Sequence, residues 1–429
     1  MNLRLKFAGS LFLIGLLFVG CSKKDPVKQV HIQNGATVLL SQYPSSISSA
    51  AVLLPFGSVD GPDYLAALTA NALLRGSEIR TGQQLYEEIE LLGGRIHVET
   101  ELTQTLVWIQ APEDNFNACF RLLCEAISKP AFDQPEIVMV YQQLLKESAK
   151  DYNAYWKANS WIDDRVRHDL FGNSQLGRPR FKKSQLYDRE QVLDFYQNHV
   201  HADEMIFALA GTFNKADVMA VIESSFEEQS GKLEVRSAVN PEKMNCISEE
   251  IYHDPSELAQ VYLALRAPGR LKHGYVEMHI LRNALSLNLP LWRRSMQLPS
   301  NPKHSIQLNV MYQSGDTYGY FFLGANRYSQ DIEETRQTLL RFVEHLQKNG
   351  MPEEIFTIAK RHLIFELMYG EQFSLNKAIH MALYYGIEES WQWNLDEALE
   401  SIENVTLDEM NQILKDTLQH PCVIMNLPQ

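Results

Sequence analysis

The stretch "RIHVETELTQTLVWIQAPEDNFNACFRLLCEAIS", residues 95–128, decides the fold class of this chain. From 95 to 111 apolar and polar residues alternate, which is the pattern of two strands that each turn one face towards a core. From 112 to 128 the spacing becomes helical, and a second long helical segment, 134–156, follows Pro130. Two strands followed by two helices predict an α+β unit, in which a mostly antiparallel sheet packs against helices.

The same order of elements recurs in the second half of the chain. Three later segments match the strand pair and the two helices in order, namely residues 305–326, 331–350 and 352–367. The last of them begins with "PEEI" (352–355), and the matching helix of the first half has "PEIV" (135–138) near its start. A repeat of roughly 200 residues predicts two homologous domains, at 31–230 and 245–429. The polar segment 227–245 lies at their boundary.

Residues 1–20 have the composition of a bacterial lipoprotein signal peptide. Arg4 and Lys6 precede the apolar run "FAGSLFLIGLLFV", which is short for a membrane span. The run leads into "LFVGC", which resembles a lipobox with Gly20 before the cleaved bond and Cys21 as the lipid acceptor. The alternatives are an uncleaved anchor, or an ordinary signal peptide followed by a chance cysteine.

A lipid on Cys21 attaches the mature chain to a membrane without spanning it. Residues 21–30 then serve as a short polar tether, and the folded body faces the periplasm. Ser22, directly after Cys21, is compatible with transfer to the outer membrane. We therefore expect a periplasm-facing lipoprotein anchored in the outer membrane.

The charge and the cysteines narrow the class of protein further. A formal net charge of −14 argues against a nucleic-acid partner, which needs a basic face. Four cysteines follow Cys21 and none forms a C-x-x-C pair. We expect these four to be buried thiols, namely Cys119, Cys124, Cys246 and Cys422.

Four segments, in this order, carry a resemblance to a known family. They are "LLGGRIHVETELTQTLVWIQAPEDNFNACFRLLCEAISKPAFDQPEI" (91–137), "GRP" (177–179), "DREQVLDFYQNHVHADEMIFALAGTF" (188–213) and "SELAQVYLALRAPG" (256–269). With them the chain resembles the insulinase-like M16 zinc metallopeptidases, which include the mitochondrial processing peptidase (MPP). The resemblance implies two M16-type (LuxS/MPP-like) domains, each a mostly antiparallel sheet packed against helices.

Active members of that family carry H-x-x-E-H on a helix. Residues four apart share a helix face, so the two imidazoles reach one zinc ion, while the Glu activates the metal-bound water. Aligned on "LLRGS" (73–77), this chain has Ala67 and Asn71 at the histidine positions and Ala70 at the position of the base. We therefore expect no catalytic residue and no zinc cofactor in this chain.

Two further family positions complete the comparison in the first half. Glu147 falls on the remaining zinc-ligand position, and Val140 stands where active members often carry another Glu. A single carboxylate does not hold a catalytic zinc ion by itself. Zinc is therefore expected only in a partner subunit, or at a site rebuilt elsewhere.

The second half of family members carries an Arg and a Tyr, seven residues apart, that hold the substrate. The best register in 285–308 places Gln297 and His304 there. Arg293 and Arg294 lie close by and can take this role if the register differs by a few residues. Candidate substrate-binding residues are thus Arg293, Arg294 and His304.

These observations lead to one hypothesis and two alternatives. The hypothesis is a non-catalytic M16-type lipoprotein that pairs with a separate M16 subunit carrying intact H-x-x-E-H, and helps to enclose or bind a peptide substrate. The first alternative is an active zinc metalloendopeptidase rebuilt around His199 and His201 in "HVHADE" (199–204), a segment that we interpret as a structural turn. The second is a stand-alone peptide-binding or structural lipoprotein of the envelope.

Overall fold

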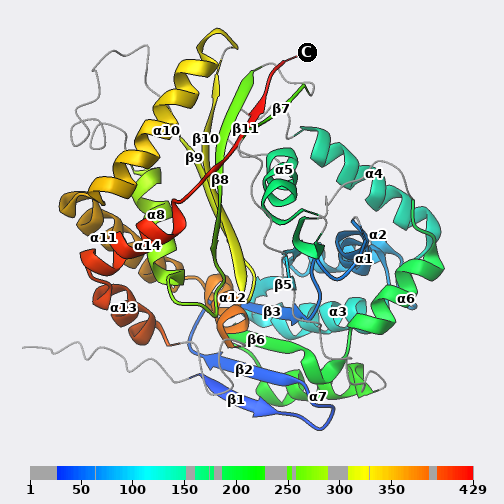
Figure 1. The fold of residues 1–429 in the computed structure, drawn as a ribbon. Coiled ribbons are helices and arrows are strands. Elements are labelled where there is room, and N and C mark those ends of the chain that lie inside the picture. The colour runs from blue at the N-terminus through cyan, green and yellow to red at the C-terminus, as the bar shows by residue number, and fades with distance from the viewer. Residues whose placement is uncertain are drawn as a thin grey trace, which may run out of the picture.

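The chain folds into two halves, each with its own sheet and its own layer of helices (Figure 1). The computed structural model describes residues 27–62, 64–150, 160–172, 174–177, 186–227, 249–253, 258–287, 308–327, 329–385 and 394–428. Within these ranges every helix is too short or too polar to cross a lipid bilayer.

The first half is built on a six-stranded sheet of order β1-β2-β6-β3-β5-β4. β2 and β6 run parallel, and the other neighbours are antiparallel. The strands are β1 (Lys28–His31), β2 (Thr37–Gln42), β3 (Ile47–Leu54), β4 (Arg95–Thr100), β5 (Thr105–Pro112) and β6 (Ile206–Gly211). The helices are α1 (Leu65–Ala72), α2 (Gly82–Leu91), α3 (Phe116–Ser128), α4 (Gln134–Lys150), α5 (Ser160–Phe171), α6 (Arg189–His199) and α7 (Lys215–Ser225).

The second half is built on a five-stranded sheet of order β7-β11-β8-β10-β9, in which only the β7–β11 pair is parallel. The strands are β7 (Glu249–Tyr252), β8 (Ala259–Pro268), β9 (Asn309–Ser314), β10 (Tyr318–Arg327) and β11 (Cys422–Asn426). The helices are α8 (Tyr275–Ser286), α10 (Ile332–Asn349), α11 (Glu353–Gly370), α12 (Ser374–Tyr385), α13 (Leu395–Asn404) and α14 (Leu407–Thr417). The α+β class and the two-fold repeat of the unit are confirmed.

Each sheet is covered on one face by a helix from the other half. α12 lays Ala378 and Met381 on the first sheet, where they pack with Ala51 of β3. In return, α5 packs Val166 against the second sheet beside Tyr320 of β10. α5 follows α4, and α12 follows the equivalent helix α11, so the two crossing helices hold equivalent places in the repeat. The exchange is therefore reciprocal, and it joins the two halves.

The cysteines depart from expectation at one position. Cys119 and Cys124 are buried free thiols, and burial raises the pKa of Cys119 to about 11. Cys422, at the start of β11, is instead disulfide-bonded, so the expectation of a buried thiol is wrong there. Spacing along the chain cannot reveal such a bond, because it depends on which distant segments the sheet brings together.

Candidate functional site

Helix α1 carries the three residues at the H-x-x-E-H positions. Its sequence "LAALTANA" is small and apolar on most sides, so the helix is buried on most of its surface. It passes into the short 3-10 turn η1 (Leu73–Arg75) and stops at Gly76, whose φ of 124° is open to glycine. The sequence "LLRGS" therefore marks the end of this helix in the structure.

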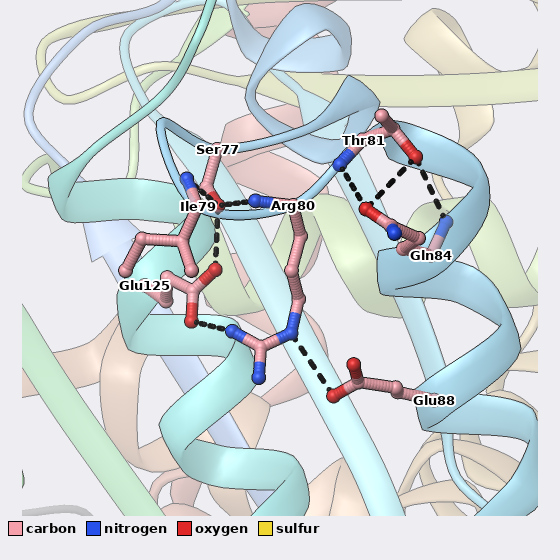
Figure 2. Close-up of polar contacts among 7 residues, drawn as sticks. All are labelled: Ser77, Ile79, Arg80, Thr81, Gln84, Glu88 and Glu125. Atoms are coloured by element: carbon pink, nitrogen blue, oxygen red, sulfur yellow. Dashed lines mark hydrogen bonds and ion pairs between the residues drawn. The ribbon is translucent and has the colours of Figure 1, made fainter.

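The turn after Gly76 is held by a polar network (Figure 2). Ser77 Oγ accepts hydrogen bonds from the backbone N–H groups of Ile79 and Arg80, at 3.1 and 3.0 Å, and donates one to Glu125 of α3. The Arg80 guanidinium donates to Glu125 and, at 3.0 Å, to Glu88 of α2. The end of α1 is thereby tied to two neighbouring helices, which sets the position of α1 in the domain.

Helix α2 begins directly after this turn with a capping box. Thr81 Oγ1 accepts from the backbone N–H of Gln84, and the Gln84 side chain accepts from the N–H of Thr81 at 3.0 Å (Figure 2). The reciprocal pair satisfies two backbone donors that a helix start otherwise leaves open. It starts α2 at a defined residue, and α2 then supplies one wall of the cavity beside α1.

A cavity of about 340 Å³ lies beside α1. Ala67 and Asn71 line it from α1, Tyr86 from α2, and Gln143 from α4, while β4 forms its remaining wall. Ala70 does not line this cavity and has no exposed surface. The two histidine positions of H-x-x-E-H thus face a cavity, and the position of the base faces the core.

The polar groups of the cavity are engaged with the protein itself. Asn71 Nδ2 donates to the carbonyl of Ala67 at 2.8 Å, so the amide is folded back on its own helix. Arg75 Nη2 donates to Gln143 Oε1 at 2.6 Å and bridges the end of α1 to α4. Burial raises the pKa of Tyr86, and the charge of Arg75 partly opposes this shift.

The cavity is poorly equipped to hold a metal ion. The methyl group of Ala67 is no ligand, and the amide of Asn71 replaces an imidazole poorly. No group of three or more His, Cys, Asp or Glu side chains suited to a metal occurs among the described residues. Glu147 follows Gln143 by one turn of α4, and its side chain lies outside the described residues.

The other residues predicted from the family comparison do not line this cavity or lie outside the described residues. Val140, where active members often carry a Glu, is buried in the core of the first half. The remaining predicted site residues lie outside the described residues, namely Cys21, Arg293, Arg294, Gln297 and His304.

The histidines of "HVHADE" belong to a turn. The His199 ring stacks on Phe195 with centroids 4.1 Å apart, and its Nδ1 lies 2.8 Å from the Phe195 carbonyl oxygen. His201 contacts the Asn198 carbonyl oxygen at 3.3 Å, just before the 3-10 turn η5 (Ala202–Glu204) that leads into β6. Both imidazoles thus contact backbone carbonyls of α6, and the structural-turn interpretation accounts for these contacts.

Sequence reasoning missed the free edge of β4. This strand is last in the sheet order and pairs only with β5 among the described strands. In the hairpin turn the Glu101 N–H donates to the Gln104 carbonyl at 2.8 Å. Because inward and outward groups alternate along an antiparallel strand, Ile96 and Val98 direct their N–H and C=O groups away from β5. Ile96 and Val98 both line the cavity.

Two family models match this chain in succession. "Insulinase (Peptidase family M16)" matches residues 37–184, and "Peptidase M16 inactive domain" matches residues 187–363. The chain belongs to the M16 peptidase family. The M16 relationship agrees with the duplicated α+β architecture.

Individual M16 relatives are distant in sequence. An "Uncharacterized zinc protease" of Rickettsia bellii is 24% identical over 202 residues, which are 46% of this chain and 48% of the relative. A "Probable mitochondrial-processing peptidase subunit beta" of Arabidopsis thaliana is 22% identical over 174 residues, 40% of this chain and 32% of the relative. The chain thus spans about half, or less, of the length of these curated relatives.

Solved M16 structures share the fold over nearly the whole chain. An M16 inactive-domain protein of Pseudomonas fluorescens superimposes with a TM-score of 0.78 and 15% identity, covering 94% of this chain and 97% of the other. A protease of Helicobacter pylori gives a TM-score of 0.76 and 14% identity, covering 94% and 99%. At this identity the likeness establishes the fold alone.

Proposed function

We propose that this chain is a non-catalytic M16 subunit that binds an extended peptide along β4 and pairs with a separate M16 chain holding the catalytic zinc. The observation that carries the proposal is the free edge of β4 beside a cavity whose α1 wall holds Ala67 and Asn71. A methyl group and a self-bonded amide supply neither a zinc ligand nor a base. What the site retains is a place for a peptide.

An unpaired strand edge recognises peptide backbone. The outward N–H and C=O groups of Ile96 and Val98 are donors and acceptors for an added strand, whatever its sequence. The cavity beside them receives alternate side chains of that strand, because neighbouring side chains point to opposite faces. Arg75 at the cavity wall favours an acidic or polar side chain there. The substrate class is therefore an extended, unfolded peptide segment.

The location of this subunit follows from its N-terminus. A lipid on Cys21 anchors it, with the folded body in the periplasm, at the outer membrane. The disulfide at Cys422 supports this placement, because disulfides persist in the bacterial periplasm and are rare in the reducing cytosol. A relative that is a subunit of a mitochondrial processing peptidase supports an M16 partner for this chain.

A proline at the edge of β4 tests peptide binding directly. Ile96→Pro removes one outward N–H and leaves the β4–β5 hydrogen bonds in place, whereas Ile96→Ala removes a comparable side chain and keeps the donor. With fluorescein-labelled, unstructured 15-residue peptides, we expect Ile96→Pro to raise Kd by about tenfold relative to Ile96→Ala, the magnitude of a lost backbone hydrogen bond. Equal affinity of the two variants refutes binding at this edge.

The pairing is tested by mild detergent extraction of the native lipoprotein and mass spectrometry of what accompanies it. We expect a second M16 chain with intact H-x-x-E-H at equal stoichiometry. Recovery of this chain alone, as a homodimer or monomer, favours a stand-alone envelope lipoprotein instead. Stoichiometric zinc and chelator-sensitive cleavage by the isolated chain would establish the active-peptidase alternative.

A further inference from the structure

Helix α11 ends in a row of exposed aromatic side chains. Phe365, Tyr369 and Phe373 follow one another at intervals of four residues, with ring centroids 5.8 and then 5.2 Å apart. Met368 is exposed beside them, and all four side chains are between 46% and 61% exposed. Soluble proteins rarely leave such a contiguous apolar surface without a partner.

The first half of the chain extends this surface. Ser374, which follows Phe373, exchanges a hydrogen bond of 2.8 Å with Ser49 of β3. Ile47 lies two residues before Ser49 on the same face of β3 and is 48% exposed. We call these five residues the corner patch: Ile47, Phe365, Met368, Tyr369 and Phe373.

β1 begins at the same corner. β1 pairs antiparallel with β2, with Lys28 opposite Leu40, so the chain before Lys28 heads towards the Tyr43 end of β2. At that end the ammonium of Lys377, one turn after Phe373, lies 4.8 Å from the centre of the Tyr43 ring. Phe373, and the corner patch with it, therefore lies at the end of the sheet where β1 begins.

The length of the tether places the corner patch close to the anchor. Val27 packs on the hydrophobic cluster that α12 forms with the first sheet. Val27 is six residues after Cys21 in the sequence, and this length of chain spans at most about 20 Å when fully extended. A lipid on Cys21 therefore holds this corner, rather than the far side of the molecule, next to the bilayer surface.

Two carboxylates beside the corner patch have polar partners within the protein. Glu366 accepts a hydrogen bond from Asn283 at 3.1 Å and lies 3.4 Å from the Arg282 guanidinium. Glu371 lies 2.8 Å from His380 Nδ1. Lys377 at the same corner adds a basic side chain beside the aromatic rings, which suits contact with lipid phosphate groups.

We propose that the corner patch docks on the lipid bilayer and orients the anchored body. This inference rests on the proposed lipidation of Cys21 and adds to it a second, non-covalent membrane contact. Tyrosine favours the boundary between lipid headgroups and acyl chains, where its ring is in apolar surroundings and its hydroxyl in wet ones, and the phenylalanine rings add buried apolar area. The cavity at β4 belongs to a different surface, so docking does not consume the peptide site.

Vesicle binding by the lipid-free chain tests the proposal. The mature chain with Cys21→Ser is mixed with sedimentable vesicles of phosphatidylethanolamine and phosphatidylglycerol, 3:1. We expect the triple variant Phe365→Ser, Tyr369→Ser and Phe373→Ser to lower the partition coefficient at least about tenfold. The control Ile79→Ser with Leu91→Ser, which removes exposed apolar side chains from the first half, should leave it unchanged. Circular dichroism shows whether each variant folds.

Three results overturn the proposal. The first is no vesicle binding by the unsubstituted chain. The second is self-association of that chain in the analytical ultracentrifuge that the triple substitution abolishes, because the occupant is then a second copy. The third is loss of a co-purifying M16 chain from the triple variant with vesicle binding intact, because the occupant is then that subunit.

The membrane proposal and the peptide proposal fail separately. Absence of lipid on Cys21 in the native protein, read by mass spectrometry, overturns the tether and this inference with it. Failure of peptides to bind at β4 leaves the vesicle result standing. The triple variant should bind the labelled 15-residue peptides as well as the unsubstituted chain does.

Discussion

His279 predicts a specific loss of stability in mild acid. It lies on α8 with its ring 4.7 Å from the ring of Tyr275 and 5.1 Å from that of Tyr312, centroid to centroid. Its Nε2 is buried and has no hydrogen-bond partner among the described residues. Burial, with a smaller contribution from the charge of Arg282, lowers the pKa of His279 to about 3.

The direction of the effect follows from the two pKa values. The unfolded chain binds a proton at His279 near its ordinary pKa of about 6.5, while the folded chain resists protonation down to about 3. The stabilisation from a neutral His279 is therefore complete above about pH 6.5 and declines as the pH falls below it. From pH 7 to pH 5 the loss amounts to about 2 kcal/mol, which is an upper bound because part of the residue is exposed.

Urea unfolding of the unsubstituted chain and of His279→Phe, each at pH 7 and pH 5, measures this contribution. Phenylalanine keeps an aromatic ring between Tyr275 and Tyr312 and removes the titrating group. We expect the loss of unfolding free energy between the two pH values to be smaller in the variant by about 1–2 kcal/mol. All other contributions to the pH dependence are common to the two proteins and cancel. Equal losses in the two proteins refute the reasoning.

Two further predictions concern α1 and the turn that follows it. The double variant Ala67→His with Asn71→His should bind zinc at least about tenfold more tightly than the unsubstituted chain in calorimetry, because both imidazoles enter the cavity. If the double variant gains no zinc affinity, the alignment on α1 is wrong. Adding Ala70→Glu to it should cost several kcal/mol in unfolding free energy, since this position is fully buried. Arg80→Met should destabilise the fold by about 2–3 kcal/mol in thermal denaturation, because Glu125 is left 15% exposed without its cation. The control is Arg121→Met, which removes an exposed ion pair of 3.9 Å and should cost less than about 1 kcal/mol. If Arg80→Met and Arg121→Met destabilise the fold equally, the polar network of Ser77, Arg80 and Glu125 has no structural role.

Much of the architecture could be predicted because it is encoded locally. The alternation at 95–111 became β4 and β5, and the helical spacing that follows became α3 and α4. The repeat in the second half became β9, β10, α10 and α11 for the same reason. The spacing of apolar residues reflects which face of a helix or strand is buried, and this spacing can be read from a single sequence.

The candidate site was only partly open to this reasoning. The alignment on "LLRGS" gave Ala67 and Asn71, and both line a cavity. The sequence did not predict that Ala70 faces the core while Ala67 and Asn71 face the cavity, because this depends on how α1 is rotated about its axis. The free edge of β4 was missed because a strand's own pattern does not say whether it has one neighbour or two.

The sequence by itself thus determined the class of fold, the duplication, and the absence of imidazoles from the aligned positions of α1. Tertiary structure alone decided which surfaces meet. It exchanged α5 and α12 between the sheets and joined Cys422 in a disulfide. It also gathered Ile47 and the aromatic row at the end of α11 at one corner of the molecule. The reason is physical: a residue pattern states that a face must be covered, but the partner that covers it comes from a distant part of the chain.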